Sequence, residues 1–126
     1  MIRLLVTGFG PFPGMKRNPS AVLAARLASD LRLRRNGVQV SARLVPTTWV
    51  DVDRLVPRLA AARPDAVLML GVAARRRGLS IEMRARNRLT QHPDAAGRRA
   101  GPRIIAAGGG AVRPGRAPFR RLAVAA

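Results

Sequence analysis

Residues 2–20, IRLLVTGFGPFPGMKRNPS, join two predicted elements of different kinds. The run from Ile2 to Thr7 is apolar apart from Arg3 and contains several β-branched residues, which is typical of a central parallel strand buried on both faces. Asn18-Pro19-Ser20 then supplies an N-cap residue with proline at the first helical position. A buried strand followed by a loop and a helix predicts an α/β fold.

The rest of the chain continues this alternation. The expected elements are a helix over 19–35 ended by Asn36-Gly37, a strand over 38–46, a helix over 50–62 interrupted or kinked at Pro57, a buried strand over 66–70 and an extended segment over 80–87. This order favours right-handed parallel crossovers, with ligand sites at the carboxyl ends of the strands. Residues 92–126 are rich in Gly, Pro and Arg, so we expect them to be mostly irregular, with a short strand near 103–107 and a helix from about Pro118.

The charge of the chain is strongly unbalanced. It has 24 basic residues, of which only Lys16 is a lysine, against 6 acids, for a net charge of +18. Such an excess favours polyanionic partners, and it leaves a basic nucleic-acid-binding module as an alternative function. Against a specific nucleic-acid interface, the arginines are spread along the chain apart from a cluster at residues 75–77, and aromatic residues make up only 3%.

The composition also limits the cellular compartment and the catalytic chemistry that we expect for the chain. The chain has no cysteine, so it contains no disulfide, no thiolate metal site and no cysteine nucleophile. Its first apolar run is too short for a signal peptide, and no run reaches the roughly eighteen residues needed to cross a bilayer. We therefore expect a cytoplasmic protein that does not associate with membranes.

The loop between the first strand and the first helix is the best candidate for a binding site. Its glycines follow the spacing G-x-G-x-x-x-G, which matches neither the dinucleotide fingerprint nor a P-loop. It also holds Phe9 and Phe12, two of only three phenylalanines in the chain. Aromatic side chains in such a loop are expected to pack or to grip a ligand. Together with Asn18 they could hold a small flat amide ring.

Two motifs, taken in order, make the chain resemble the pyroglutamyl-peptidase I family over residues 1–94. The run LLVTGFGPFPGMKRNPS is similar to that family's strand, T-G-F-x-P-F-x-G and N-P-S, and PDAVLMLGVAARRRGLSIEMRARN is similar to its second conserved segment. The resemblance implies a three-layer α/β/α sandwich with a mostly parallel sheet and a cysteine peptidase that removes N-terminal pyroglutamate without metal or cofactor. It also implies a homo-oligomer.

The resemblance assigns roles to particular residues. Phe9 and Phe12 would line the lactam pocket, Asn18, Gly71 and Arg76 would complete the substrate-binding residues, and Glu82 would be the acid of a Cys-His-Glu triad. In such a triad the carboxylate orients the histidine while the thiolate attacks the carbonyl.

The chain departs from the family at the nucleophile. The family's cysteine and histidine come after the region that corresponds to residue 126, and the single histidine here, His92, lies in a loop before Pro93. No G-x-S-x-G elbow offers a serine instead. We therefore expect residues 1–126 to form one partial domain that is inactive alone, with a sheet incomplete at the C-terminal end and an exposed apolar edge. A lactam-binding module without catalysis is the alternative within the same fold.

Overall fold

A computed structural model describes residues 1–101 and 103–121 of the chain. The chain divides into two compact units. The first contains Met1–Val72 and Pro93–Arg98, and the second contains Ala73–His92 and Arg99–Ala126.

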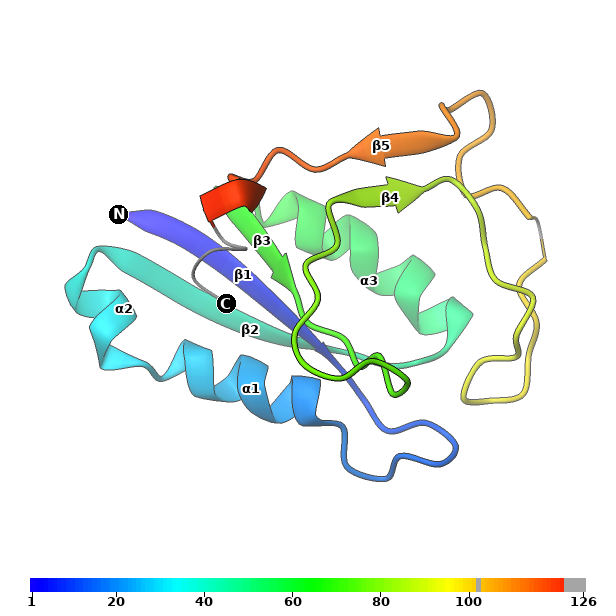
Figure 1. The fold of residues 1–126 in the computed structure, drawn as a ribbon, viewed down its shortest axis with the longest axis horizontal. Helices are drawn as coiled ribbons and strands as arrows, with labels where there is room; N and C mark the ends of the chain where they lie inside the picture. The colour runs from blue at the N-terminus through cyan, green and yellow to red at the C-terminus, as the bar shows by residue number, and fades with distance from the viewer. Residues whose placement is uncertain (102, 122–126) are drawn as a thin grey trace. The chain divides into compact units, whose positions relative to one another are not determined.

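The first unit is built on a parallel sheet of three strands, with β1 (Ile2–Phe9) in the middle. β2 (Val38–Val45) pairs with β1 along its whole length, and β3 (Ala66–Met69) pairs with the other side of β1 (Figure 1). The buried residues of β1 are in its second half and include Leu5, Val6 and Thr7. The central position expected for the first strand is confirmed.

Two short helices replace the single helix expected over residues 19–35. α1 (Pro19–Ala28) begins at the Asn18 cap, and α2 (Leu31–Arg35) begins at Asp30, whose side chain accepts a hydrogen bond from the Arg32 amide. The expectation of one helix was wrong because Asp30 caps a new helix after the first one ends. Asn36 then ends α2, as expected.

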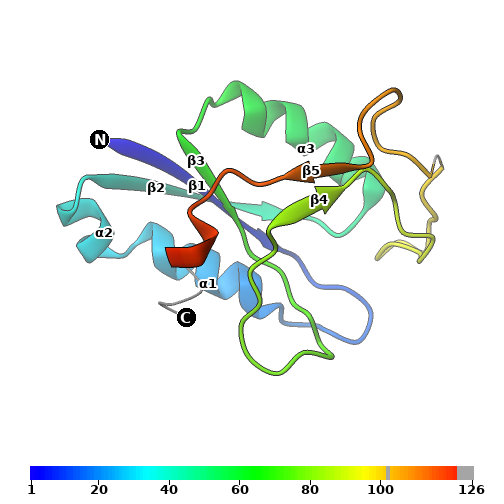
Figure 2. The same cartoon turned by 45° about the horizontal axis from the view of Figure 1, so that its top comes forward.

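Helix α3 (Trp49–Ala61) connects β2 to β3 and runs through Pro57 without an interruption. Its first turn is capped by Thr48, which accepts from the Asp51 amide. In the sheet, β2 lies on one side of β1 and β3 lies on the other, so the β1–β2 and β2–β3 connections run in opposite directions across the sheet. Right-handed crossovers therefore place α1 and α3 on opposite faces of the sheet, as Figure 2 shows. This is the α/β/α layering expected from the resemblance.

The strand β3 is exposed rather than buried. All four of its residues are exposed, including Val67 at 53% and Met69 at 69%. Among the described residues β3 pairs only with β1, so it forms an edge of the sheet. The apolar run suggested burial on both faces, but a strand is buried only where neighbours cover it. The exposed apolar edge that we expected is therefore present.

The second unit holds a two-stranded antiparallel ribbon, in which β4 (Arg84–Arg86) pairs with β5 (Val112–Pro114). The strand expected near residues 103–107 is absent. Instead, the Asn87 side chain bonds both the amide and the carbonyl of Ala106, each at 2.8 Å. This side chain occupies backbone groups that a ladder would need, and residues 106–109 form a turn closed by the Gly109 amide donating to the Ala106 carbonyl at 3.1 Å. Residues 119–121 are helical, and the remainder of the helix expected from Pro118 lies outside the described residues.

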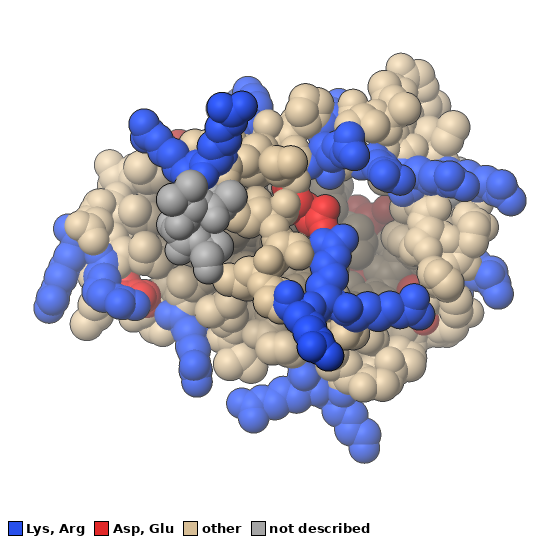
Figure 3. Space-filling view, viewed as in Figure 1, with Lys and Arg blue, Asp and Glu red and all other residues tan. Residues whose placement is uncertain are grey.

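Basic side chains extend outward in many places on the face shown in Figure 3, several of them side by side, and few acidic groups lie between them. Within the described part of the chain there are three salt bridges, Arg3–Asp65, Arg32–Asp30 and Arg76–Glu82. In the second of these, hydrogen bonds from the side chain and backbone of Arg32 lower the pKa of Asp30 to about 2. Exposed pairs of this kind add little stability, because water screens them.

Candidate functional site

The end of β1 and the start of α1 approach each other closely at Gly8. A Cβ atom on Gly8 would lie 2.5 Å from the carbonyl oxygen of Ser20 and 2.8 Å from the Cα of Ala21. Only glycine fits without moving the helix. Gly8 thus sets where the loop leaves the sheet, and it places Phe9 as the last residue of the strand.

A buried hydrogen-bond network joins this strand end to the helix. Asn18 and Ser20 are 5% and 4% exposed. The Asn18 side-chain oxygen accepts from the Ser20 amide at 3.1 Å and from the Ser20 hydroxyl at 2.7 Å, and its amide nitrogen donates to the Gly10 carbonyl at 3.1 Å. The Ser20 hydroxyl in turn accepts from the Phe9 amide at 2.9 Å. Asn18 therefore supports the loop through its backbone.

Sequence reasoning recognised Asn18 but missed the role of Ser20. The hydroxyl of Ser20 makes two bonds within the network, so it acts as a structural link and is not free to serve as a nucleophile. The signal was present in N-P-S, because a serine two residues after an N-cap can reach both the cap and the preceding strand.

The outer part of the loop is tied down on both sides. Phe12 and Met15 exchange backbone hydrogen bonds of 3.2 and 2.8 Å, and the Thr47 hydroxyl donates to the Pro11 carbonyl at 2.8 Å. Phe9 and Phe12 are both half-buried. At the end of the neighbouring strand, a Cβ atom on Gly71 would lie 3.9 Å from Cε2 of Phe9. Of the expected lactam-binding residues, Phe9, Asn18 and Gly71 thus cluster at the carboxyl end of the sheet.

A shallow hollow of about 360 Å³ lies elsewhere on the first unit. It opens over the first turns of α1 and is lined by Pro19, Val22 and Leu23 between Arg17 and Arg26. Neither Phe9 nor Phe12 lines it. The hollow lies on the outer surface of the helix and gathers no acid, histidine or hydroxyl, so the carboxyl end of the sheet remains the better candidate site.

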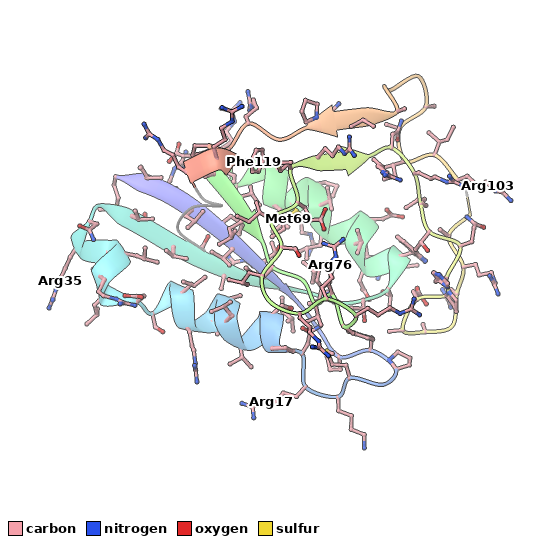
Figure 4. The ribbon with its side chains drawn as sticks, viewed as in Figure 1. Arg17, Arg35, Met69, Arg76, Arg103 and Phe119 are labelled. Atoms are coloured by element: carbon pink, nitrogen blue, oxygen red, sulfur yellow. The ribbon has the colours of Figure 1, made fainter. Side chains whose placement is uncertain are left out.

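In the second unit, Arg76, which is labelled in Figure 4, forms a salt bridge of 2.8 Å with Glu82. The two side chains are 54% and 74% exposed. Glu82 lies two residues before β4, so of the extended segment expected over residues 80–87 only Arg84–Arg86 forms a strand. The three-residue β4 begins only where β5 provides a pairing partner. The pair places the Arg76 guanidinium directly beside the Glu82 carboxylate.

The single histidine, His92, is exposed, and its backbone amide donates to the Thr90 hydroxyl at 3.2 Å. The expectation of a surface loop around His92 is therefore confirmed. Over the described ranges, no helix combines the length and the apolar character that a membrane crossing requires. The cytoplasmic location stays a prediction.

Comparison with known proteins gives consistent matches. A family model described as pyroglutamyl peptidase matches residues 2–125. The chain is 41% identical over 87 residues to a pyrrolidone-carboxylate peptidase of Gloeobacter violaceus, covering 68% of this chain and 41% of that protein. It is 33% identical over 124 residues to one from Chromobacterium violaceum, covering 97% of this chain and 58% of the relative.

Solved structures agree with these relatives. The crystal structure of pyrrolidone carboxyl peptidase from Thermus thermophilus matches with a TM-score of 0.86 and 32% identity, covering 97% of this chain and 62% of that one. Pyroglutamyl peptidase I from Bacillus amyloliquefaciens matches with a TM-score of 0.82 and 27% identity, over 97% and 59% of the two chains. The chain thus spans less than two thirds of the length of these relatives.

Proposed function

Since this chain belongs to the pyroglutamyl peptidase family, we propose that it carries the part of such a peptidase that binds the lactam ring of an N-terminal pyroglutamate. We also propose that these 126 residues do not cleave the pyroglutamyl bond by themselves. The relatives are named for pyrrolidone-carboxylate peptidase activity. Such an activity requires both binding of the lactam ring and cleavage of the bond next to it.

The observation that carries the binding proposal is the ordered loop after β1. The backbone of Phe9 is fixed through its amide, Asn18 is buried against the loop backbone, and the Cβ position of Gly71 lies 3.9 Å from the Phe9 ring. A loop backbone held in place before the ligand arrives loses little conformational entropy on binding. A flat five-membered lactam offers a face for ring contacts and one amide for hydrogen bonds, which suits such a site.

Glu82 is proposed as the acid that would orient a histidine in the complete catalytic triad. Its salt bridge to Arg76 supports this role, because a carboxylate already held by one donor has its second oxygen available for an imidazole. Within the sequence, however, no cysteine exists to act as the nucleophile. Without a thiolate the acyl-enzyme route is closed, so only binding remains.

Binding is tested by calorimetry with 2-pyrrolidone and with pyroglutamate. We expect weak binding of each, because so small a ligand makes few contacts. Phe9→Ala and Phe12→Ala are each expected to abolish the heat. The matched control is Phe119→Ala, because Phe119 is the remaining phenylalanine of the chain and lies in the second unit. This substitution is expected to leave the heat of binding unchanged. No heat with the unaltered chain at millimolar ligand would exclude a usable lactam site.

Catalysis is tested separately with a fluorogenic pyroglutamyl amide. The purified chain is expected to release no fluorophore above the uncatalysed rate. Iodoacetamide provides the control, since it inactivates cysteine peptidases and has no thiol to modify here. A signal that iodoacetamide removes would come from a contaminating host enzyme. A signal that resists iodoacetamide and disappears in Glu82→Gln would contradict the proposed inactivity.

A further inference from the structure

The positive charge of the chain is concentrated in the second unit. The first unit has twelve basic residues and five acids, a net charge of +7 over 78 residues. The second unit has twelve arginines and one acid, a net charge of +11 over 48 residues. Basic residues are denser in the second unit, at twelve in 48 residues against twelve in 78, and all acids except Glu82 belong to the first unit. Both differences make the charge surplus greater in the second unit.

The single acid of the second unit is already paired. Glu82 accepts from Arg76, and the other eleven arginines of the unit have no carboxylate partner among the described residues. All twelve arginines are exposed. Like charges gathered in this way repel one another and destabilise the folded unit, unless an anionic partner neutralises them. The surplus therefore favours a polyanionic ligand.

Three of these arginines are held on a regular frame. Arg84 and Arg86 lie two residues apart in β4, so they project from the same face of the ribbon. Arg113 lies on β5 opposite Ala85, and it projects from the other face. Two further backbone hydrogen bonds extend the pairing beyond both strand ends. The backbone N–H of Asn87 donates to the Ala111 carbonyl at 2.9 Å, and the backbone N–H of Gly115 donates to the Met83 carbonyl at 2.8 Å. The backbone spacing of the three charges is thus set before a ligand binds.

We propose that the exposed β4–β5 ribbon binds the phosphate backbone of duplex nucleic acid. Guanidinium groups bond phosphate oxygens in bidentate fashion, and a duplex presents phosphates in a continuous row. Single strands are disfavoured because their binding relies on aromatic stacking, and the only aromatic residue of the second unit is Phe119, which is half-buried. The binding is independent of base sequence and separate from the lactam site.

The test is fluorescence anisotropy of a labelled mixed-sequence DNA duplex, titrated with the full chain between about 50 and about 200 mM salt. We expect the affinity to fall steeply as salt rises. The triple variant Arg84→Gln, Arg86→Gln, Arg113→Gln is expected to bind at least about tenfold more weakly at low salt, and to reduce the salt slope by about 0.9 for each phosphate that it no longer neutralises. The triple lysine variant keeps the charges, so it should retain most of the affinity.

The matched control removes three exposed arginines of the first unit, Arg26, Arg34 and Arg35, by substitution with glutamine. It lowers the net charge by the same amount and is expected to retain most of the affinity. An equal loss of affinity in both glutamine variants would overturn the proposal, since the ribbon would then add nothing beyond net charge. Equal affinity for polyglutamate or for anionic lipid vesicles would also overturn it. Circular dichroism of each variant establishes that it is folded.

Discussion

At the scale of single residues, Gly8 is the position on which the strand, the loop and the first helix depend together. The space for a Cβ atom is taken by the backbone of Ser20 and Ala21. Backbone atoms cannot move aside as the end of a flexible side chain can, so a larger residue must displace α1. The same helix start holds Asn18, which anchors the loop at the Gly10 carbonyl. Packing at Gly8 therefore also sets the geometry of the candidate lactam site.

Replacing Gly8 with alanine should destabilise the chain by about 1–3 kcal/mol, the usual cost of overpacking a rigid site. Urea unfolding measures the change. Gly10→Ala is the matched control, because the nearest atom to its added Cβ would be 3.8 Å away. The close approach would be disproved if both variants unfolded at the same urea concentration.

At the scale of elements, α3 is anchored by a segment distant in sequence. The Asp94 carboxylate accepts from the amide of Trp49, the first residue of the helix, at 3.0 Å. It also accepts from the amides of Ala96 and Arg98, and the Ala95 amide donates to Thr47. The segment Pro93–Arg98 therefore belongs to the first unit. These hydrogen bonds, the Trp49 amide first, lower the pKa of Asp94 below its ordinary value of 3.8.

Asp94→Asn is expected to lower the urea midpoint at neutral pH. Because the pKa of Asp94 is lowered in the folded chain, its carboxylate stabilises the fold above pH 3.8, and this contribution is lost as the pH falls through the folded-state pKa. The difference in urea midpoint between Asp94→Asn and the unaltered chain should therefore become smaller at acidic pH. Asp53→Asn, at an exposed position on α3, should change the urea midpoint at neutral pH much less. A difference in urea midpoint that does not change with pH would contradict this role of Asp94.

Pro57 weakens the helix that contains it. It lies inside α3, where it has no amide to donate to the preceding turn. Pro57→Ala should restore that hydrogen bond and stabilise the chain by about 1–3 kcal/mol. Urea unfolding and the helical signal in circular dichroism measure the gain. Val56→Ala, at a neighbouring exposed position, keeps its amide and should change stability much less. An unchanged midpoint for Pro57→Ala would mean that the helix is already broken there.

At the scale of the whole molecule, charge and apolar exposure act in opposite directions. The net charge of +18 keeps chains apart, whereas β3, an edge strand among the described residues, exposes Val67, Leu68 and Met69. Exposed apolar edge strands pair readily with other chains. Salt screens the repulsion and leaves the apolar attraction in place. Self-association, expected from the family resemblance, should therefore increase as salt rises.

Met69→Lys should reduce that self-association. A charge on an edge strand opposes pairing with another chain, because the paired strand would bury it. Leu79→Lys adds the same charge at a position that is 85% exposed and outside any strand. Sedimentation at high salt should show a larger monomer fraction for Met69→Lys than for Leu79→Lys. Equal effects of the two substitutions would show that net charge alone controls association and that the edge does not.

Features that depend on neighbouring residues could be predicted from the sequence alone. These are the strand from Ile2, the helix start at Asn18, the end of α2 at Asn36 and the two motifs that carry the family resemblance. Each is a short-range pattern of caps, turns and apolar runs, which the local chain satisfies without help from distant segments.

Features that depend on distant partners could not be predicted from the sequence, because they are set by contacts between remote segments. An apolar run such as β3 is buried or exposed according to which elements cover it, and no residue of the strand records that. The ladder of β4 formed with Val112–Pro114 because Asn87 held the backbone of Ala106 in a turn. Ser20 became part of the loop network because Gly8 lets the helix approach the strand. Burial and pairing are properties of contacts made across the chain, so they became visible only in the folded molecule.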